Sequence, residues 1–218
     1  MVAVALALAT AGCTSSDEHA ANLTAGTPTE QVEAIHYFTE SEPPGEVRSE
    51  FRELLLRVAE GAPSGAGRSA ALQVMGEKKD PAFLEALLSA LEDPSFIVRY
   101  RAAEALGKYG DPAAVEPLAQ VLEDDRHDWV RMEAAQALTL IGDHRAIEPL
   151  IHALDEDNPA PVRFDAYLGL KALTGLALDR RRETWVEWWE KEGRRRYPPL
   201  RAAPESEHVP EPDSGKNE

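Results

Sequence analysis

The apolar residues between positions 96 and 124 recur at the spacing of two short amphipathic helices. The first helix would bury one face, made of Val98, Ala102, Ala105, Leu106 and Tyr109. The second would bury Val115, Leu118, Ala119 and Leu122. Residues at these spacings lie on one side of an α-helix, so both faces can pack inward. Gly110 and Asp111, which lie between the two patterns, favour a helix stop followed by an N-cap.

This two-helix pattern repeats along the chain with a period of 31 to 32 residues. An Asp-led phrase precedes one helix of each copy, at Asp80, Asp111 and Asp143. A Val-Arg phrase opens the other helix, at Val98, Val130 and Val162, and Arg68 marks a weaker forerunner. About four copies span residues 66–176, and no strand pattern falls between them. The sequence therefore predicts an all-α stack of helix–turn–helix repeats.

Two more helical segments are predicted to cap the ends of this stack. Residues 46–60 place five apolar residues on one helical face, Val47, Phe51, Leu54, Leu55 and Val58. At the other end, Trp185, Trp188 and Trp189 stand at helical spacing. A terminal repeat exposes its apolar side unless a cap covers it. We therefore expect one folded repeat domain over residues 46–192.

The repeated phrases resemble HEAT repeats, in particular the short HEAT-like repeats of phycobilisome lyases. The resemblance implies a right-handed α-solenoid of about four repeats. Arg99, Arg131 and Arg163 match the repeated arginine of that family. The family's acidic partners would correspond to Asp93, Asp124 and Asp157. The resemblance thus implies a structural arginine ladder that joins the helix turns.

One repeat position, directly after the repeated arginine, is a candidate for partner binding. It holds Tyr100, Met132 and Phe164, which project away from the apolar stripe of their helices. In HEAT proteins this helix lines the concave surface, and exposed aromatic and methionine side chains suit a peptide-binding groove. Four neighbours would complete the surface: Glu104, Gln136, Tyr167 and Leu168. The alternative is that the ladder of Tyr100, Met132 and Phe164 is buried between adjacent repeats.

The amino terminus predicts a secretion signal. Residues 2–9 are apolar, yet they fall short of the roughly 20 residues that span a bilayer. They lead to Cys13, the only cysteine, and the segment resembles a bacterial lipoprotein signal. That resemblance implies a signal peptide over residues 1–12 and a lipidated Cys13 in the cell envelope, at an outer membrane and facing the periplasm. Residues 13–45 are expected to form an acidic, flexible tether with at most a short helix around residues 31–38, and residues 193–218 a disordered tail.

Composition narrows the classes of function. The formal net charge of −16 would repel a phosphate backbone, so we do not expect nucleic-acid binding. The histidines at 127, 144 and 152 lack a metal-binding pattern, and no metal site or cofactor is predicted. No nucleophile or phosphate-loop motif occurs. Residues 179–201 carry eight basic and five acidic residues, a region that either binds an anionic partner or forms a solvated rim.

These observations predict a non-enzymatic scaffold for protein–protein interaction, a lipoprotein tethered to a bacterial membrane. Its partner would be another protein or a peptide. The alternative is a bilin-lyase-like enzyme or an accessory factor for cofactor attachment, in line with the phycobilisome lyases. Those relatives act in the cytoplasm, so a signal sequence argues against the alternative.

Overall fold

A computed structural model describes residues 22, 26–41 and 47–198. Within these residues the chain forms helices and turns and no strand, so the all-α prediction is confirmed. The α-helices are α2 (Pro28–Ser41), α3 (Ser49–Gly61), α4 (Gly65–Lys78), α5 (Leu84–Ser89), α6 (Phe96–Tyr109), α7 (Val115–Asp124), α8 (Asp128–Ile141), α9 (Ile147–His152), α10 (Ala160–Thr174), α11 (Arg182–Trp188) and α12 (Arg194–Arg196). Short 3-10 turns precede α5, α7 and α9, and a π-helical turn (Trp189–Gly193) joins α11 to α12.

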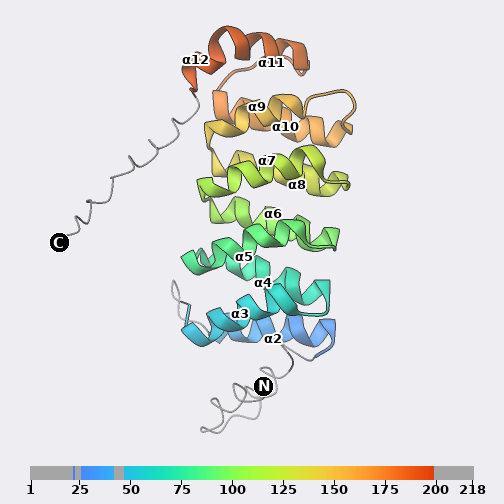
Figure 1. Ribbon diagram of the computed structural model, residues 1–218, viewed down its shortest axis with the longest axis vertical. Coiled ribbons are helices and arrows are strands. Elements are labelled where there is room, and N and C mark those ends of the chain that lie inside the picture. The colour runs from blue at the N-terminus through green and yellow to red at the C-terminus, as the bar shows by residue number, and fades with distance from the viewer. Residues whose placement is uncertain (1–21, 23–25, 42–46, 199–218) are drawn as a thin grey trace, which may run out of the picture.

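The helices stack in two rows along the long axis of the molecule (Figure 1). One row, here called the first row, contains α3, α5, α7, α9 and α11. The second row contains α2, α4, α6, α8 and α10, each of which packs on the next. Each pair of consecutive helices from α3/α4 to α9/α10 is one helix–turn–helix repeat. The predicted α-solenoid is therefore confirmed.

Small residues allow neighbouring helices of the second row to pack closely. A Cβ added at Gly76 would lie 2.7 Å from the Cα of Ala105, and one at Gly107 would lie 2.8 Å from the Cα of Ala137. A Cβ at Gly169 would lie 2.4 Å from Oγ1 of Thr139. These helices touch almost backbone to backbone, which only glycine permits at such points. The contact surfaces of neighbouring repeats are therefore rigid and specific in shape.

The core runs through every repeat at equivalent positions. Four fully buried residues share one position, seven residues after the repeated arginine: Met75, Leu106, Leu138 and Leu170. The valines of the Val-Arg phrase, Val98, Val130 and Val162, are equally buried. The apolar stripe predicted from helical spacing is thus the surface by which each repeat packs on its neighbours.

Helix ends follow the local chemistry of the repeated Gly-Asp phrase. Gly110, Gly142 and Gly175 end α6, α8 and α10 with φ of 81°, 77° and 71°. This left-handed conformation is favourable for glycine because it lacks a Cβ. After Gly110 and Gly142, the next helical segment starts at Asp111 and Asp143, whose carboxylates accept a hydrogen bond from the N–H two residues later. Asp80 caps its segment in the same way, but it follows Lys79, which has a φ of 52°. The predicted stop and cap therefore occur in the structure as a tight, reproducible turn.

The stack begins earlier than the sequence suggested. Helix α2 lies in a segment expected to be part of the 13–45 tether, yet Ala34 and Ile35 are buried in the core against α4. The expected boundary at residue 46 is therefore wrong. Helix α2 forms because Thr27 and Glu30 make a capping box at its start, in which the Thr27 N–H donates to Glu30 Oε2 at 2.7 Å. Helix α2 is thus the amino-terminal cap. Helix α3, expected to be that cap, is instead the first helix of the first repeat.

The carboxyl end of the stack is closed by tryptophans, as expected. Trp185 is fully buried, and its ring meets Tyr167 edge-on at a centroid distance of 6.5 Å. The packing continues through the π-helical turn to Tyr197, which contacts the ring of Trp188. The boundary expected at residue 192 therefore lies too early. Residues 199–218, most of the expected tail, lie outside the described residues, as do Cys13 and the expected signal peptide.

Candidate partner-binding site

The ladder of Tyr100, Met132 and Phe164 lies on the outward side of α6, α8 and α10. Phe164 is 43% exposed, whereas Tyr100 and Met132 are half-buried, and Met132 contacts the edge of the core. The structure therefore lies between the two alternatives stated above. The Phe164 side chain is exposed, whereas those of Tyr100 and Met132 are partly exposed and partly covered by their neighbours.

The four expected neighbours do not all belong to this surface. Leu168 is 43% exposed and lies one helical turn from Phe164. Gln136 donates a hydrogen bond to Asp165 at 3.1 Å, which links α8 to α10. Glu104 is held by Arg101 and Lys108 on its own helix. Tyr167 packs on Trp185 and so belongs to the carboxyl-terminal cap.

Trp129 and Ile97 were missed as candidates, although they are more exposed than the ladder itself. Trp129 is 64% exposed and Ile97 is 51% exposed. Both occupy the repeat position just before the buried valine of the Val-Arg phrase. A residue three positions before a ladder residue shares its helix face, so helical spacing alone could have identified them.

These residues together define one surface, which we call the apolar strip. It consists of Ile97, Tyr100, Trp129, Met132, Phe164 and Leu168. Because α6, α8 and α10 pack side by side, the strip crosses three consecutive repeats. Exposed apolar side chains on neighbouring repeats, with a tryptophan among them, are typical of protein-binding surfaces.

A buried carboxyl group supports the strip between α6 and α8. Glu133 is only 6% exposed, and burial raises its pKa above the usual value. The Tyr100 hydroxyl donates a hydrogen bond to it. Burial, followed by this hydrogen bond and the charge of Glu133, raises the pKa of Tyr100 to about 12. The pair fixes the Tyr100 ring at the surface.

The repeated arginines join neighbouring repeats, though not all in the expected way. Arg99 binds Asp125 of the next repeat through two hydrogen bonds of 2.6 and 3.0 Å, so the expected partner Asp124 is wrong by one residue. Asp93 pairs with an earlier arginine, Arg68, at 2.7 Å. Burial by itself would raise the pKa of Asp125, but the hydrogen bonds from Arg99 and from the His127 N–H outweigh it and hold that pKa below its usual range.

Among the residues that the structure describes, the arginine ladder makes no third ion pair between repeats. Arg131 pairs with Asp128 of its own helix at 2.7 Å and does not reach Asp157. The two repeats differ in the length of their first-row helix. Helix α7 continues to Asp124, whereas α9 ends at His152 and is followed by a run of turns that contains Asp157. Within the described part of the chain, Arg163 donates only to main-chain carbonyl groups, those of Glu156 and Asn158.

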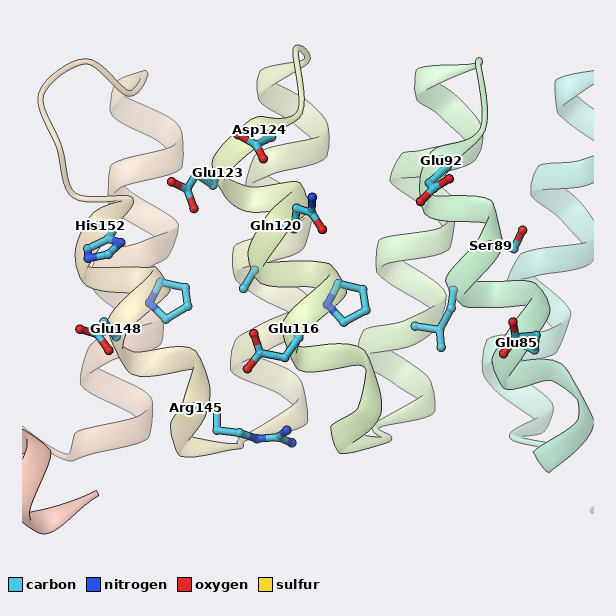
Figure 2. A pocket seen from close by; sticks show the side chains of 14 residues that line it. Glu85, Ser89, Glu92, Glu116, Gln120, Glu123, Asp124, Arg145, Glu148 and His152 are labelled. Atoms are coloured by element: carbon cyan, nitrogen blue, oxygen red, sulfur yellow. The ribbon is translucent and has the colours of Figure 1, made fainter. Parts of the chain in front are cut away.

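The first row carries a different surface, an open groove of 960 Å³ across α5, α7 and α9 (Figure 2). Glutamates occupy one repeat position along it: Glu85, Glu116 and Glu148. Glu92, Glu123 and Asp124 add further carboxylates at its rim, and Arg145 is the arginine that lines it. This surface would repel nucleic-acid phosphates, in keeping with the net charge.

The basic residues near the carboxyl end are partly neutralised by their neighbours. Arg181 pairs with Asp179 at 2.7 Å, and Arg194 pairs with Glu148 at 2.8 Å.

Two of the histidines considered as metal ligands lie in different surroundings: His152 lines the acidic groove, and His144 lies beside Asp143. Over residues 22, 26–41 and 47–198, no group of three or more His, Cys, Asp and Glu side chains is placed to hold a metal ion. Nor is any helix in this part of the chain both long and apolar enough to cross a membrane.

Comparison with known proteins agrees with this architecture. The family model described as HEAT repeats matches residues 52–139 and 124–171, more than half of the chain. The chain belongs to the HEAT-repeat family. No curated protein matches the sequence. HEAT repeats commonly act as scaffolds for protein interaction.

Proposed function

We propose that this protein is a non-enzymatic interaction scaffold that binds another protein or a peptide through the apolar strip. The observation that carries the proposal is the exposure of Trp129, 64% of whose surface is open to solvent at the middle of three stacked repeats. Interfaces draw most of their free energy from a few large anchors, and tryptophan is the most enriched of them. Met132, one turn away on α8, and Phe164, on α10, would extend the contact on one side of that anchor.

The rigidity of the second row supports this function. Its helices approach through glycine and alanine, as at Gly107 and Ala137, and buried ion pairs such as Arg99–Asp125 tie successive repeats together. A surface built on such a frame loses little conformational entropy on binding. The strip is therefore suited to recognise one defined shape.

The membrane tether is the second part of the proposal. It is supported by the apolar residues 2–9 followed by Cys13, the only cysteine. A lipid on Cys13 would restrict the scaffold to the surface of the bacterial envelope, at an outer membrane facing the periplasm. The test is the substitution Cys13→Ser. We expect the variant to leave the membrane fraction and to lose incorporation of labelled palmitate, whereas retention of both would refute the tether.

The binding role is tested by site-specific crosslinking. A photoreactive amino acid at position 129 should give one dominant crosslinked protein in intact cells. The matched control is position 120 on α7, an exposed residue of the acidic groove on the first row. Equal crosslinking to the same protein from both positions, or only diffuse products from position 129, would contradict binding at the strip.

A further inference from the structure

A second site lies where the arginine ladder ends. A pocket of 620 Å³ opens between the start of α10, the turns after α9 and the segment before α11. Four arginines line it: Arg163, Arg180, Arg181 and Arg182. Arg181 and Arg182 lie near aspartates, Asp179 at 2.7 Å and Asp155 at 3.8 Å. Arg163 and Arg180 form no ion pair with any carboxylate of the residues that the structure describes.

Arg163 keeps one of the two contacts made by the arginines that bind a carboxylate elsewhere in this chain. In Arg68 and Arg99, Nη1 donates to a main-chain carbonyl of the preceding turn, and the Nε–Nη2 edge holds an aspartate of the next repeat. Arg163 keeps the first contact, from Nη1 to the carbonyl of Asn158. Among the described residues, no aspartate of a following repeat meets its other edge. Arg163 lines the pocket, and its Nε–Nη2 edge is the planar donor pair available to a ligand there.

Arg180 adds a second fixed guanidinium. Its Cζ lies 5.1 Å from the ring centre of Phe164 and 5.4 Å from that of Tyr167. These cation–π contacts position the group without neutralising its charge. The pocket also includes Ala160, the first residue of α10, where the helix dipole favours a negative ligand.

The carboxylates around the pocket limit what can bind. Glu156, Asp157 and Glu183 are exposed on its lining. They would repel a phosphate dianion more than a group with a single negative charge. A carboxylate matches the charge and the bidentate geometry that Arg68 and Arg99 already use.

We propose that this pocket binds a carboxylate group of a partner polypeptide between Arg163 and Arg180. The carboxylate would pair with the Nε–Nη2 edge of Arg163 while Arg180 closes over it. The inference does not rest on the role of the apolar strip, because its test measures binding at these two arginines. The carboxylate can belong to an acidic side chain or to a chain terminus, and two probes separate these sources.

The test uses the full-length protein labelled with ¹⁵N-arginine, observed through the Nε–Hε signals of its arginines by NMR. N-acetyl-aspartate methylamide represents a side chain, N-acetylglycine represents a chain terminus, and inorganic phosphate is the comparison ligand. We expect a saturable shift of the Arg163 and Arg180 signals with at least one carboxylate probe. Phosphate at equal concentration should give a weaker response.

Substitutions then assign the site. Arg180→Gln changes an exposed side chain, so it should keep the fold while weakening the probe's affinity about tenfold. Arg163→Lys keeps the charge but loses the planar edge, and should weaken binding similarly. Arg57→Gln, an exposed arginine on α3, is the matched control and should leave affinity unchanged. Unsaturable shifts at all arginines, tighter binding of phosphate, or unchanged affinity in Arg180→Gln would overturn the proposal.

Discussion

Arg99 and Asp125 form a buried ion pair that joins α6 of one repeat to the turn before α8 of the next. Nε of Arg99 lies 2.6 Å from Oδ2 of Asp125, and the two side chains are 8% and 6% exposed. Nη1 of the same arginine binds the carbonyl oxygen of Asp93, in the turn before its own helix. One guanidinium therefore links two consecutive inter-helix turns, which is how the repeat phrase fixes the spacing of the stack.

The first prediction concerns this ion pair. Asp125→Asn should lower the free energy of unfolding by about 3 kcal/mol at pH 7, because it leaves a buried guanidinium without its counter-charge. Urea denaturation monitored by circular dichroism measures the change. The control is Asp128→Asn, which removes the partner of Arg131 from a side chain that is 54% exposed. That variant should change stability by less than about 1 kcal/mol.

The pair also predicts a pH dependence. The pKa of Asp125 is lowered in the folded protein, so its contribution to stability is complete above the unfolded value of about 3.9. This contribution is lost as the pH falls below that value and through the lower folded pKa. The stability difference between wild type and Asp125→Asn should therefore stay constant from pH 7 to pH 5 and shrink towards pH 3. A difference that grew on acidification would contradict the assignment.

The second prediction tests the register of the repeats. Leu138 is fully buried, so Leu138→Ala should cost about 2–5 kcal/mol. Leu140, two residues later on α8, is 65% exposed, and Leu140→Ala should change stability by no more than about 0.5 kcal/mol. Equal melting temperatures for the two variants would show that the buried face of α8 has been misassigned.

The sequence predicted the solenoid well because its signals are local and repeated. The spacing of Val98, Ala102 and Leu106 defines one helix face, and Gly110 with Asp111 ends one helix and caps the next segment. With a period of about 32 residues, the helix face occurs three times and the Gly-Asp pair twice, so each copy supports the others. Helix α2 was missed as part of the stack because it has no copy elsewhere. The sequence indicated at most a short helix around residues 31–38, and a capping box of Thr27 and Glu30 precedes it.

The binding surface was predicted only in part, because exposure depends on packing between repeats. Tyr100, Met132 and Phe164 share one repeat position but differ in exposure. A buried glutamate beneath Tyr100 and an arginine over Phe164 set the environment of each ring. Trp129 lies on the same helix face, but it precedes the repeated arginine and so falls outside the repeat position on which the prediction rested. The pairing of Arg99 with Asp125 likewise depends on a turn conformation that the repeat phrase does not specify.

The third prediction concerns the close approach of α6 and α8. Gly107→Ala would place a Cβ 2.8 Å from the Cα of Ala137, so the helices must move apart. We expect a loss of about 1–3 kcal/mol in the free energy of unfolding. In Gly61→Ala, at the end of α3, the new Cβ meets no atom within 4 Å. That control should have the same melting temperature as wild type or a slightly higher one, because alanine lowers the conformational entropy of the unfolded chain.

The fourth prediction concerns the buried carboxyl group under the strip. Burial raises the pKa of Glu133, so stability should decrease as the pH rises from its unfolded value of about 4.3 through the folded value. Glu133→Gln removes the cost of the buried charge and can still accept the Tyr100 hydrogen bond. It should be more stable than wild type at pH 7 and nearly equal to it at pH 4. Lower stability than wild type at pH 7 would show that the charge itself is needed.

The most direct test of the interaction scaffold is the affinity of Trp129→Ala for the protein that crosslinks at position 129. Trp129 is 64% exposed, so its removal should leave the melting temperature nearly unchanged. Loss of a central anchor should weaken binding by at least about 2 kcal/mol, a roughly thirtyfold rise in Kd measured by titration calorimetry. Gln120→Ala, on the first row, should bind as wild type does. A folded Trp129→Ala variant with wild-type Kd would contradict the account.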